Sequence, residues 1–310
     1  MNLNLALLQK FERGLDPQHP ERSAIPATIL GYGEISTVFA IQADGWRDLA
    51  CKRLPLFDRQ AEVEKYRAAY DAYNRLLEEQ IGLRLPPHTG ACVENRLGRP
   101  VFYIIQKQLP AASIGHHALH TLPTPDILAL VERVLQELRK VWKFNRAQDR
   151  VQVAIDGQIS NWALDDPRPV YLDTSTPLFR VEGVEQLDTE LFLRSAPSFL
   201  VWILRLLFLK DVVARYYDFH RVAVDLVANF YKEQRADLIP EVVQIVNRFF
   251  QDQAAALGIQ PITEKEVRDY YRDDALVWSL YFSMRKADRF LRLRLLRQTY
   301  PYILPDKITR

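Results

Sequence analysis

The first third of the chain alternates short apolar runs with turns that contain glycine. The Ala43–Gly45 stretch "ADG" is a hairpin signal between two of these runs. A second hairpin is predicted over Gly90–Leu109, with its turn at Leu97–Pro100. The pattern therefore predicts an antiparallel sheet. The three runs before the second hairpin are Ala27–Leu30, Thr37–Ile41 and Arg47–Leu54.

Helical spacing replaces this alternation in two places. Within Asp58–Gln80 the apolar residues recur every three or four positions, which predicts one long helix between the third strand and the second hairpin. After a proline-rich connector, Pro125–Asn145 has the pattern of an amphipathic helix with proline in its first turn. Beyond about Asp188 most of the chain has long helical patterns, broken at Pro240, Pro261 and Pro301.

The most apolar segment is Phe199–Val213, "FLVWILRLLFLKDVV". It contains Arg205 and Lys210, and its uncharged runs are much shorter than the roughly 20 residues needed to cross a bilayer. We expect a helix buried in a helical core, and no membrane span.

Composition places the chain among globular proteins. It has 310 residues, 48% of them hydrophobic and 26% charged, with a formal net charge of +2. A total this close to neutral gives no argument for a nucleic-acid partner. Cys51 and Cys92 are the only cysteines, which excludes a disulfide framework and suits a cytoplasmic protein, and the N-terminus lacks the features of a signal peptide.

Small residues are concentrated in the turn "GYGEISTVF" between the first two strands. Gly31, Gly33 and Ser36 would let backbone N–H groups approach phosphate oxygens. The alternative is a plain hairpin that uses glycine for its backbone freedom.

Lys52 stands in the middle of the apolar strand "LACKRL". Period-two alternation places it on one face with Ala50 and Leu54. Either its ammonium faces solvent, or it meets a partner, because a lysine is rarely buried without one. Glu62 and Glu64, near the start of the predicted helix, serve its dipole, or one of them turns inward to pair with Lys52.

Three oxygen-bearing residues follow the helix Pro125–Asn145. Asn161 opens one strand of a predicted tight hairpin and Asp173 follows the other, so they should lie side by side. Asp156 stands just upstream, after the apolar run "VQVAI". Such a group suits Mg²⁺ bound to nucleotide phosphates. The alternative is three unrelated turn residues, because Asp and Asn are common turn formers.

The order and spacing of these elements resemble the protein kinase-like superfamily, including its aminoglycoside and choline phosphotransferase branch. The resemblance covers Gly31 to Asp173: the glycine-rich loop, the strand lysine in "LACK", a following helix, the D-x4-N loop Asp156–Asn161, and an aspartate after the next hairpin. It implies an α+β, bilobal fold. An N-lobe of residues 1–107 would carry an antiparallel sheet and one long helix, a connector would follow at 108–123, and a mostly helical C-lobe at 124–310 would include the catalytic hairpin 151–175.

The resemblance also implies roles for these residues. Lys52 would hold the phosphates of ATP and would be fixed by Glu64, with Glu62 as the alternative. Asn161 and Asp173 would bind Mg²⁺, and Asp156 would orient the substrate hydroxyl. The connector near Gln106 and Gln108 would contact adenine through its backbone.

Several positions depart from the family pattern. Ala154 stands where the family has a histidine, and Thr174-Ser175 follows Asp173 where protein kinases have Phe-Gly. Ser36 replaces the third glycine, and no "APE" motif is present. A regulated Ser/Thr kinase is therefore disfavoured.

The function predicted is phosphotransfer to a hydroxyl of an unidentified, small-molecule or protein acceptor. One alternative is a non-catalytic nucleotide-binding or scaffold module. Another is an enzyme that transfers a nucleotide instead of phosphate.

Three further stretches stay open. His116, His117 and His120 form a polar loop or a metal site. The basic stretch Met284–Gln298 is a solvated helix face balanced by acidic residues upstream, or it contacts an acidic membrane or nucleic acid; we favour the solvated face. The aromatic stretches "RYYDFH" and "RDYYRDD" pack the helical region, or line a substrate pocket.

Overall fold

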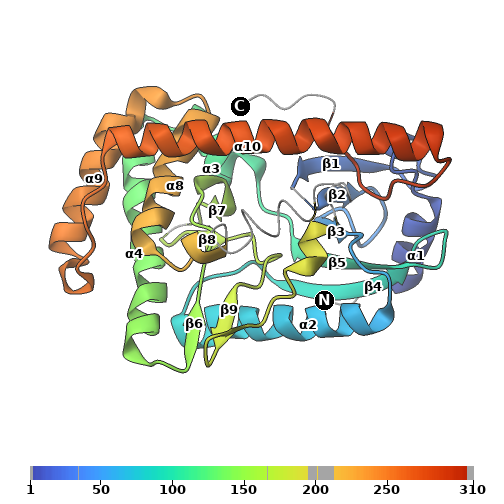
Figure 1. Ribbon diagram of the computed structural model, residues 1–310, viewed down its shortest axis with the longest axis horizontal. Coiled ribbons are helices and arrows are strands. Elements are labelled where there is room, and N and C mark those ends of the chain that lie inside the picture. The colour runs from blue at the N-terminus through green and yellow to red at the C-terminus, as the bar shows by residue number, and fades with distance from the viewer. Residues whose placement is uncertain (1–2, 34, 166, 195–200, 202–212, 306–310) are drawn as a thin grey trace.

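A computed structural model describes the chain except for residues 1–2, 34, 166, 195–200, 202–212 and 306–310. The fold is mixed α+β, with a five-stranded antiparallel sheet towards one end and most of the helices towards the other (Figure 1). Most of the apolar segment Phe199–Val213, and Glu34 of the glycine-rich turn, lie outside the described residues.

The sheet has the strand order β1-β2-β3-β5-β4, and every neighbouring pair is antiparallel. The predicted strands and both predicted hairpins are confirmed, with Gly45 and Gly98 at positive φ in the two turns. The third strand begins at Leu49, two residues later than predicted. The bounds are β1 Ala27–Tyr32, β2 Thr37–Ile41, β3 Leu49–Leu54, β4 His88–Glu94 and β5 Pro100–Lys107.

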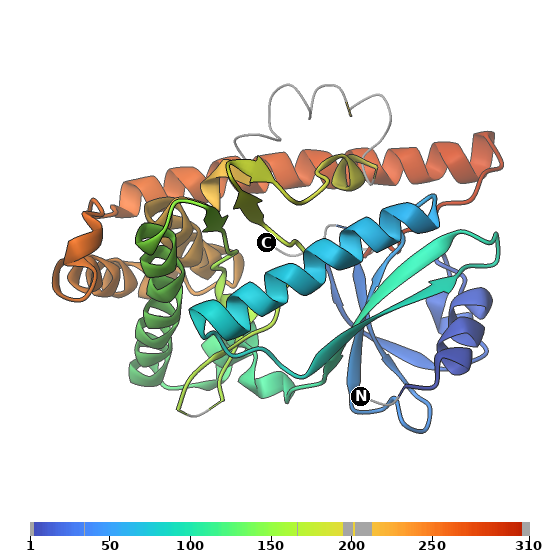
Figure 2. The same cartoon turned by 90° about the horizontal axis from the view of Figure 1, so that it is seen from below.

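Each face of the sheet is covered by one helix. Helix α1, Leu5–Gly14, packs Leu8 and Phe11 onto one face, and Asn4 caps its first turn. Helix α2, Gln60–Arg75, crosses the other face, as Figure 2 shows, and its buried stripe is the predicted one. The helix continues as one wider turn, Leu76–Ile81, where the sequence predicted ordinary α-helix to Gln80.

A buried ionic network ties α1 to the sheet. The guanidinium of Arg53 donates two hydrogen bonds of 2.7 Å to the Glu12 carboxylate, and the Tyr103 hydroxyl donates a third at 2.6 Å. Arg53 also donates to the carbonyl oxygen of Pro301, 248 residues further along the chain. These contacts satisfy a charged pair that is almost completely buried.

The helical region has its own large core, to which α4, α8 and α9 contribute most. Helix α4 begins with proline in its first turn, as predicted. The connector is more ordered than the sequence suggested, because it contains a 3₁₀ turn, Ala111–Ser113, and the short helix α3. The long helix α10 passes over both regions of the molecule (Figure 1). The bounds are α3 Gly115–Thr121, α4 Thr124–Ala147, α5 Glu190–Leu193, α8 Phe219–Lys232, α9 Ile239–Asp252 and α10 Glu264–Phe290.

Short strands between α4 and α5 flank the three oxygen-bearing residues, which lie in the turns and loops next to them. Strands β7 and β8 form the predicted tight hairpin, with Trp162 opposite Tyr171. A three-stranded sheet of order β10-β9-β6 lies beside it. The bounds are β6 Val151–Val153, β7 Trp162–Ala163, β8 Val170–Tyr171, β9 Phe179–Val181 and β10 Val184–Glu185.

Within the described part of the chain, no helix combines the length and apolar character that crossing a membrane requires. Both cysteines are free; Cys51 is buried, and Cys92 is only partly so.

Candidate functional site

The Lys52 ammonium meets a carboxylate from another part of the chain. Its Nζ lies 2.7 Å from Asp173 Oδ1, and the two side chains are 17% and 32% exposed. Alternation along β3 sets this geometry, because Lys52 shares a face with Leu54 while Arg53 points to the α1 side. The alternative that the Lys52 ammonium faces solvent without a partner is therefore wrong.

Ser175 completes this contact. Its hydroxyl donates to Asp173 Oδ1 at 2.6 Å and accepts from Lys52 at 3.1 Å, and its backbone N–H also donates to Asp173. Tyr66 of α2 donates to the Ser175 carbonyl oxygen and anchors the segment. Burial alone would raise the pKa of Asp173, but the charge of Lys52 and the hydrogen bonds from Lys52 and Ser175 lower it below its usual value.

Asn161 and Asp173 lie at the same end of the β7–β8 hairpin. The carbonyl oxygen of Asn161 accepts from the backbone N–H of Leu172, which directly precedes Asp173. The Asn161 amide also donates, at 3.4 Å, to the carbonyl oxygen of Asp156. The structure thus brings Asn161 and Asp173 together, as the hairpin spacing predicted, and the contact through the Asp156 backbone places Asp156 next to them.

Asp156 begins a tight loop whose shape depends on the next residue. A Cβ on Gly157 would lie 2.5 Å from Val222 Cγ1 of α8, so only glycine fits there. The backbone N–H of Gln158 donates to Asp156 Oδ1 at 3.1 Å. Burial, together with the charge of Asp225, raises the pKa of Asp156 to about 7 against the opposing effect of that hydrogen bond. A carboxyl group with such a pKa can accept a proton near neutral pH.

The glycine-rich turn is a tight hairpin next to Lys52. Val38 of β2 pairs with Lys52, and the turn follows at the end of β1. A Cβ on Gly33 would lie 2.5 Å from the Ser36 hydroxyl, so any other residue there would require this hydroxyl to rotate away, whereas a Cβ on Gly31 would meet no atom within 4 Å. Ser36 is buried.

The connector residues use their backbone donors within the protein. Lys107 N–H donates to the Pro87 carbonyl oxygen, and Gln108 N–H donates to that of Asp48. The Gln106 side chain donates to the Leu172 carbonyl oxygen at 3.0 Å and so joins the sheet to the hairpin. Gln108 Oε1 is buried and has no hydrogen-bond partner among the described residues.

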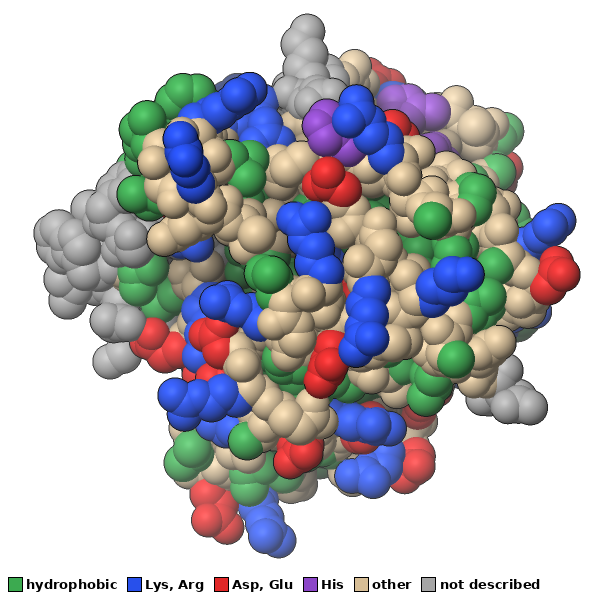
Figure 3. Space-filling view, turned by 90° about the vertical axis from the view of Figure 1, so that its right-hand side faces the viewer, with side chains coloured by type: hydrophobic (Ala, Val, Ile, Leu, Met, Phe, Trp, Pro, Cys, Tyr) green, Lys and Arg blue, Asp and Glu red, His purple; other side chains and the backbone are tan. Residues whose placement is uncertain are grey.

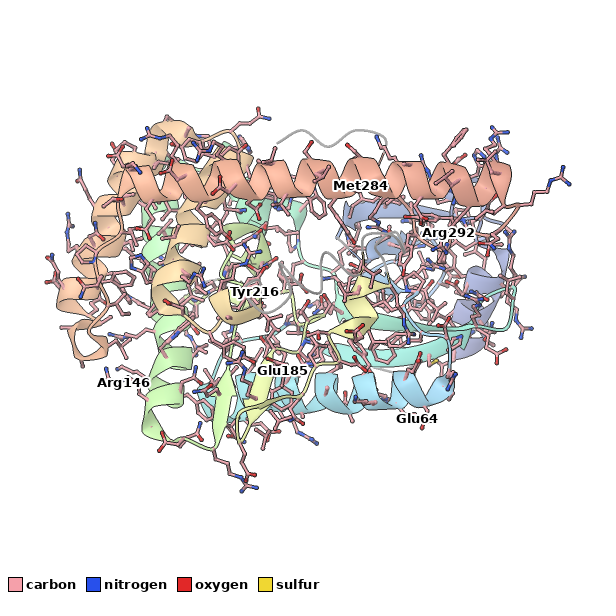
Figure 4. The ribbon with its side chains drawn as sticks, viewed as in Figure 1. Glu64, Arg146, Glu185, Tyr216, Met284 and Arg292 are labelled. Carbon is pink, nitrogen blue, oxygen red and sulfur yellow. The ribbon has the colours of Figure 1, made fainter. Side chains whose placement is uncertain are left out.

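Neither helix glutamate lies next to Lys52. Glu64 is exposed and lies on the side of α2 turned away from the sheet (Figure 4). Glu62 caps the start of α2 and pairs bidentately with Arg194, whose hydrogen bonds lower the pKa of Glu62 to about 2. The structure therefore brings neither glutamate to Lys52, and the face of α2 nearest the site carries tyrosines instead.

A polar hollow adjoins Asp156 on the side of the helical region. Gln158 forms its edge, where it donates to Asp225 and accepts from Asn229 and Lys232. Asn229 is 3% exposed, and its Oδ1 has no partner among the described residues. Burial raises the pKa of Asp225, the charge of Arg215 opposes this rise, and Asp274 adds to it. The lining consists of Gln158, Asp225, Ala228, Asn229, Lys232, Tyr270, Tyr271 and Asp274.

Sequence reasoning missed most of this hollow. Asp225, Asn229 and Lys232 recur at i, i+4 and i+7 along α8, so they form one polar stripe on a helix whose neighbouring residues are buried. The spacing of these polar residues was the feature of the sequence from which the hollow could have been predicted. Tyr270 and Tyr271 of the "RDYYRDD" stretch do line the hollow, as one of the two readings of that stretch allowed.

Asp173 and Asn161 are suitable ligands for Mg²⁺. The described hydrogen bonds of the Asp173 carboxylate all use Oδ1, and those of the Asn161 side chain use only its amide nitrogen. Asp173 Oδ2 and Asn161 Oδ1 thus take part in none of the described hydrogen bonds. Oxygen atoms of this kind are the ligands that Mg²⁺ prefers. The described residues contain no group of three or more His, Cys, Asp or Glu that could hold a metal, the histidines of α3 included.

Comparison with known proteins gives little further guidance. No curated protein matches the chain. One similar solved structure, "WaaP in complex with acyl carrier protein", is 15% identical and covers 81% of this chain and 96% of its own, with a TM-score of 0.33. A similarity with so low a TM-score supports no argument about fold or function.

One family model spans most of the sequence. It matches residues 18–289, which include every residue of the site described above. The chain is therefore a member of DUF6206, a family of unknown function.

Proposed function

We propose that this protein is a kinase-like phosphotransferase that uses ATP with Mg²⁺ to phosphorylate a hydroxyl group of a small polar molecule. The observation that carries the proposal is the 2.7 Å contact between Lys52 Nζ, from the sheet, and Asp173 Oδ1, from beyond the hairpin. Phosphotransfer needs a cation for the phosphates and a carboxylate for their metal within a few ångströms of each other.

Each residue of the group then has a role. Lys52 would move from Asp173 to the α- and β-phosphates, while Ser175 keeps the Asp173 carboxylate oriented. Asn161 and Asp173 would hold Mg²⁺, which when bound would neutralise charge on the phosphates. The turn at Gly31, Gly33 and Ser36 would cover them.

The acceptor would enter the polar hollow beside Asp156. There Asp156 would accept or orient the acceptor's hydroxyl proton, and its raised pKa suits this task. Asn229 Oδ1 and the Asp225 carboxylate offer hydrogen-bond acceptors, so we propose a ligand rich in N–H or O–H donors.

In this proposal residues 1–107 and 124–310 act as the two lobes of a kinase-like fold, joined by the connector 108–123. Adenine would lie at the connector. Because the backbone N–H groups of Lys107 and Gln108 are engaged, we assign the base contact to Gln108 Oε1, which can accept a hydrogen bond from the adenine amino group.

A second candidate is a non-catalytic nucleotide-binding or scaffold module. One observation favours it: no glutamate of α2 reaches Lys52, so no partner there would hold the lysine once it leaves Asp173. The presence of Asp156, Asn161 and Asp173 in one group favours the phosphotransferase over this non-catalytic module.

Labelled ATP tests the proposal. The purified protein with Mg²⁺ and a pool of small metabolites should yield a phosphorylated product, or at least slow ATP hydrolysis. Asp156→Asn and Asp173→Asn should lower turnover by roughly a hundredfold or more, because each removes a group that acts on the reacting phosphate or hydroxyl. Asp149→Asn, an exposed aspartate seven residues before Asp156, is the matched control and should be unaffected.

Equal activity in all four proteins would overturn the assignment of these residues. Nucleotide-dependent thermal stabilisation without turnover in the unsubstituted protein would support the scaffold instead.

A further inference from the structure

The end of α10 carries an unusual concentration of exposed apolar and basic side chains. We call residues Arg289–Arg297, "RFLRLRLLR", the basic apolar end. Phe290, Leu295 and Leu296 are 59%, 67% and 60% exposed there. Leu293 alone is packed against a core, and Arg292 is the only arginine of this segment with an anionic partner among the described residues, Asp288 at 3.0 Å.

The charge of this segment is not balanced by its surroundings on the helix. The acidic residues expected to offset it, Asp273 and Asp274, lie on α10 about 16 residues before its end, or roughly 24 Å along the axis. That separation exceeds the screening length of about 8 Å at physiological ionic strength. The side chains of Arg289, Arg294 and Arg297 therefore present uncompensated positive charge.

The segment also stands at the periphery of the molecule. Arg292 marks its place beyond Met284 near one end of the long helix (Figure 4). Figure 3 looks at this end of the molecule, and hydrophobic and basic side chains lie next to each other at its upper left, where α10 ends.

We propose that the basic apolar end binds the surface of a membrane that contains anionic lipids. Arginine side chains would pair with the lipid phosphates, while Phe290, Leu295 and Leu296 would enter the boundary between headgroups and acyl chains. Leucine side chains favour this partner over nucleic acid, which binds basic surfaces through aromatic stacking and phosphate contacts. The lipid would be a docking surface, and the described helices still include none that spans a bilayer.

Vesicle co-sedimentation of the full chain tests this proposal. The protein should sediment with vesicles of phosphatidylcholine mixed with phosphatidylglycerol and stay in solution with phosphatidylcholine alone. Arg294→Ser with Arg297→Ser should weaken binding roughly tenfold or more, because each basic residue near an anionic surface contributes about fivefold. Leu295→Ser with Leu296→Ser should weaken it similarly through lost insertion.

The matched control is Leu276→Ser with Leu280→Ser. This pair is on the same helix and is equally exposed, at 71% and 60%, but it follows the acidic residues. Binding should be unchanged in this variant. The proposal fails if the protein does not sediment with anionic vesicles, or if the control weakens binding as much as the test pair. It also fails if an oligonucleotide competes for the site and only the arginine variant loses binding.

Discussion

Lys52 and Asp173 form an ion pair, and the rest of the site is built around it. An ammonium and a carboxylate 2.7 Å apart, both shielded from much of the solvent, cannot lose one partner without leaving the other uncompensated. Ser175 uses its hydroxyl and its backbone N–H to hold the same Asp173 oxygen. A ligand that separates the pair must therefore supply negative charge to the Lys52 ammonium and positive charge to the Asp173 carboxylate.

Substitution of Lys52 should weaken nucleotide binding. Lys52→Met removes a charge-assisted contact worth about 1.5–3 kcal/mol, which corresponds to a loss in ATP affinity of about ten- to a hundredfold. Calorimetric titration with Mg²⁺ and ATP measures the change. Lys65→Met, which alters an exposed lysine on α2, is the control. If ATP binds both variants equally well, Lys52 does not contact the phosphates.

For single residues, the sequence predicted where a side chain lies better than it predicted which residue that side chain contacts. Period-two alternation located Lys52 on the correct face, and the hairpin spacing placed Asn161 beside Asp173. The choice of Glu64 as the partner of Lys52 rested on the order of elements alone. The stripe Val63, Tyr66, Tyr70 and Tyr73 defines the buried face of α2. On a helical projection Glu64 lies about 140° from the centre of this stripe, whereas Glu62 lies at its edge, about 20° from Tyr73. A helical projection would therefore have argued against Glu64 but not against Glu62.

Between elements, the network of Glu12, Arg53 and Tyr103 joins α1 to β3 and β5. Arg53→Met should destabilise the protein by about 3–5 kcal/mol, because it leaves the Glu12 carboxylate buried without its counter-ion. Equilibrium unfolding in urea measures this loss. The double variant Glu12→Met with Arg53→Met should lose much less than the sum of the two single variants. Strict additivity would show that the pair is not coupled.

A second contact between elements predicts a pH dependence of stability. His220 of α8 lies 2.7 Å from the Glu266 carboxylate of α10 and 2.9 Å from the Gln260 carbonyl oxygen. Both partners are acceptors, so both ring nitrogens donate only when the imidazole is charged. Burial alone would lower the pKa of His220, but these two hydrogen bonds and the Glu266 charge raise it.

The raised pKa sets the sign of the effect. The stability from this contact is fully present below about pH 6.5, the usual histidine pKa, and is lost as the pH rises through the higher folded-state value. We expect less than about 1 kcal/mol, because Glu266 is considerably exposed. His220→Gln should remove this part of the difference in unfolding free energy between pH 5.5 and pH 8.5. The exposed His120→Gln should leave it in place.

Element prediction succeeded where a local pattern decides the structure. The strands of the five-stranded sheet and the long helices α2 and α4 follow from periodicity, proline and glycine. The helix α3 inside the connector was missed, because "GHHALH" is short and is flanked by prolines. Its position depends on a tertiary contact: a Cβ on Gly115 would lie 2.0 Å from the Ile159 carbonyl oxygen, so α3 rests directly on the loop that follows Asp156.

For the molecule as a whole, a nucleotide at the site would bridge the sheet and the helical region. Mg²⁺ and ATP at about 100 times the dissociation constant should stabilise the folded state by roughly 2.7 kcal/mol. Hydrogen exchange should slow in both β3 and the loop after Asp156, because the ligand would contact both. Protection confined to one of these two segments would contradict a bridging ligand, and Lys52→Met should lose most of the effect.

The relation between distant parts of the chain was the least predictable feature. No local pattern indicates that Gln158 would join Asp156 to a polar stripe on α8, about 70 residues later. Nor does one indicate that residues 300–304 would pack against the β-sheet region. Such contacts depend on how the helices cross, which composition and periodicity do not encode.

The hydrogen bond from Arg53 to the Pro301 carbonyl oxygen has a consequence for biosynthesis. A ribosome that adds about 5–20 residues per second would need roughly 10–50 s to make the intervening 248 residues. Throughout that interval the nascent β-sheet would hold a guanidinium whose last acceptor does not yet exist. The newly made N-terminal region should therefore remain sensitive to protease, or bound to a chaperone, until translation of the helical half is nearly finished.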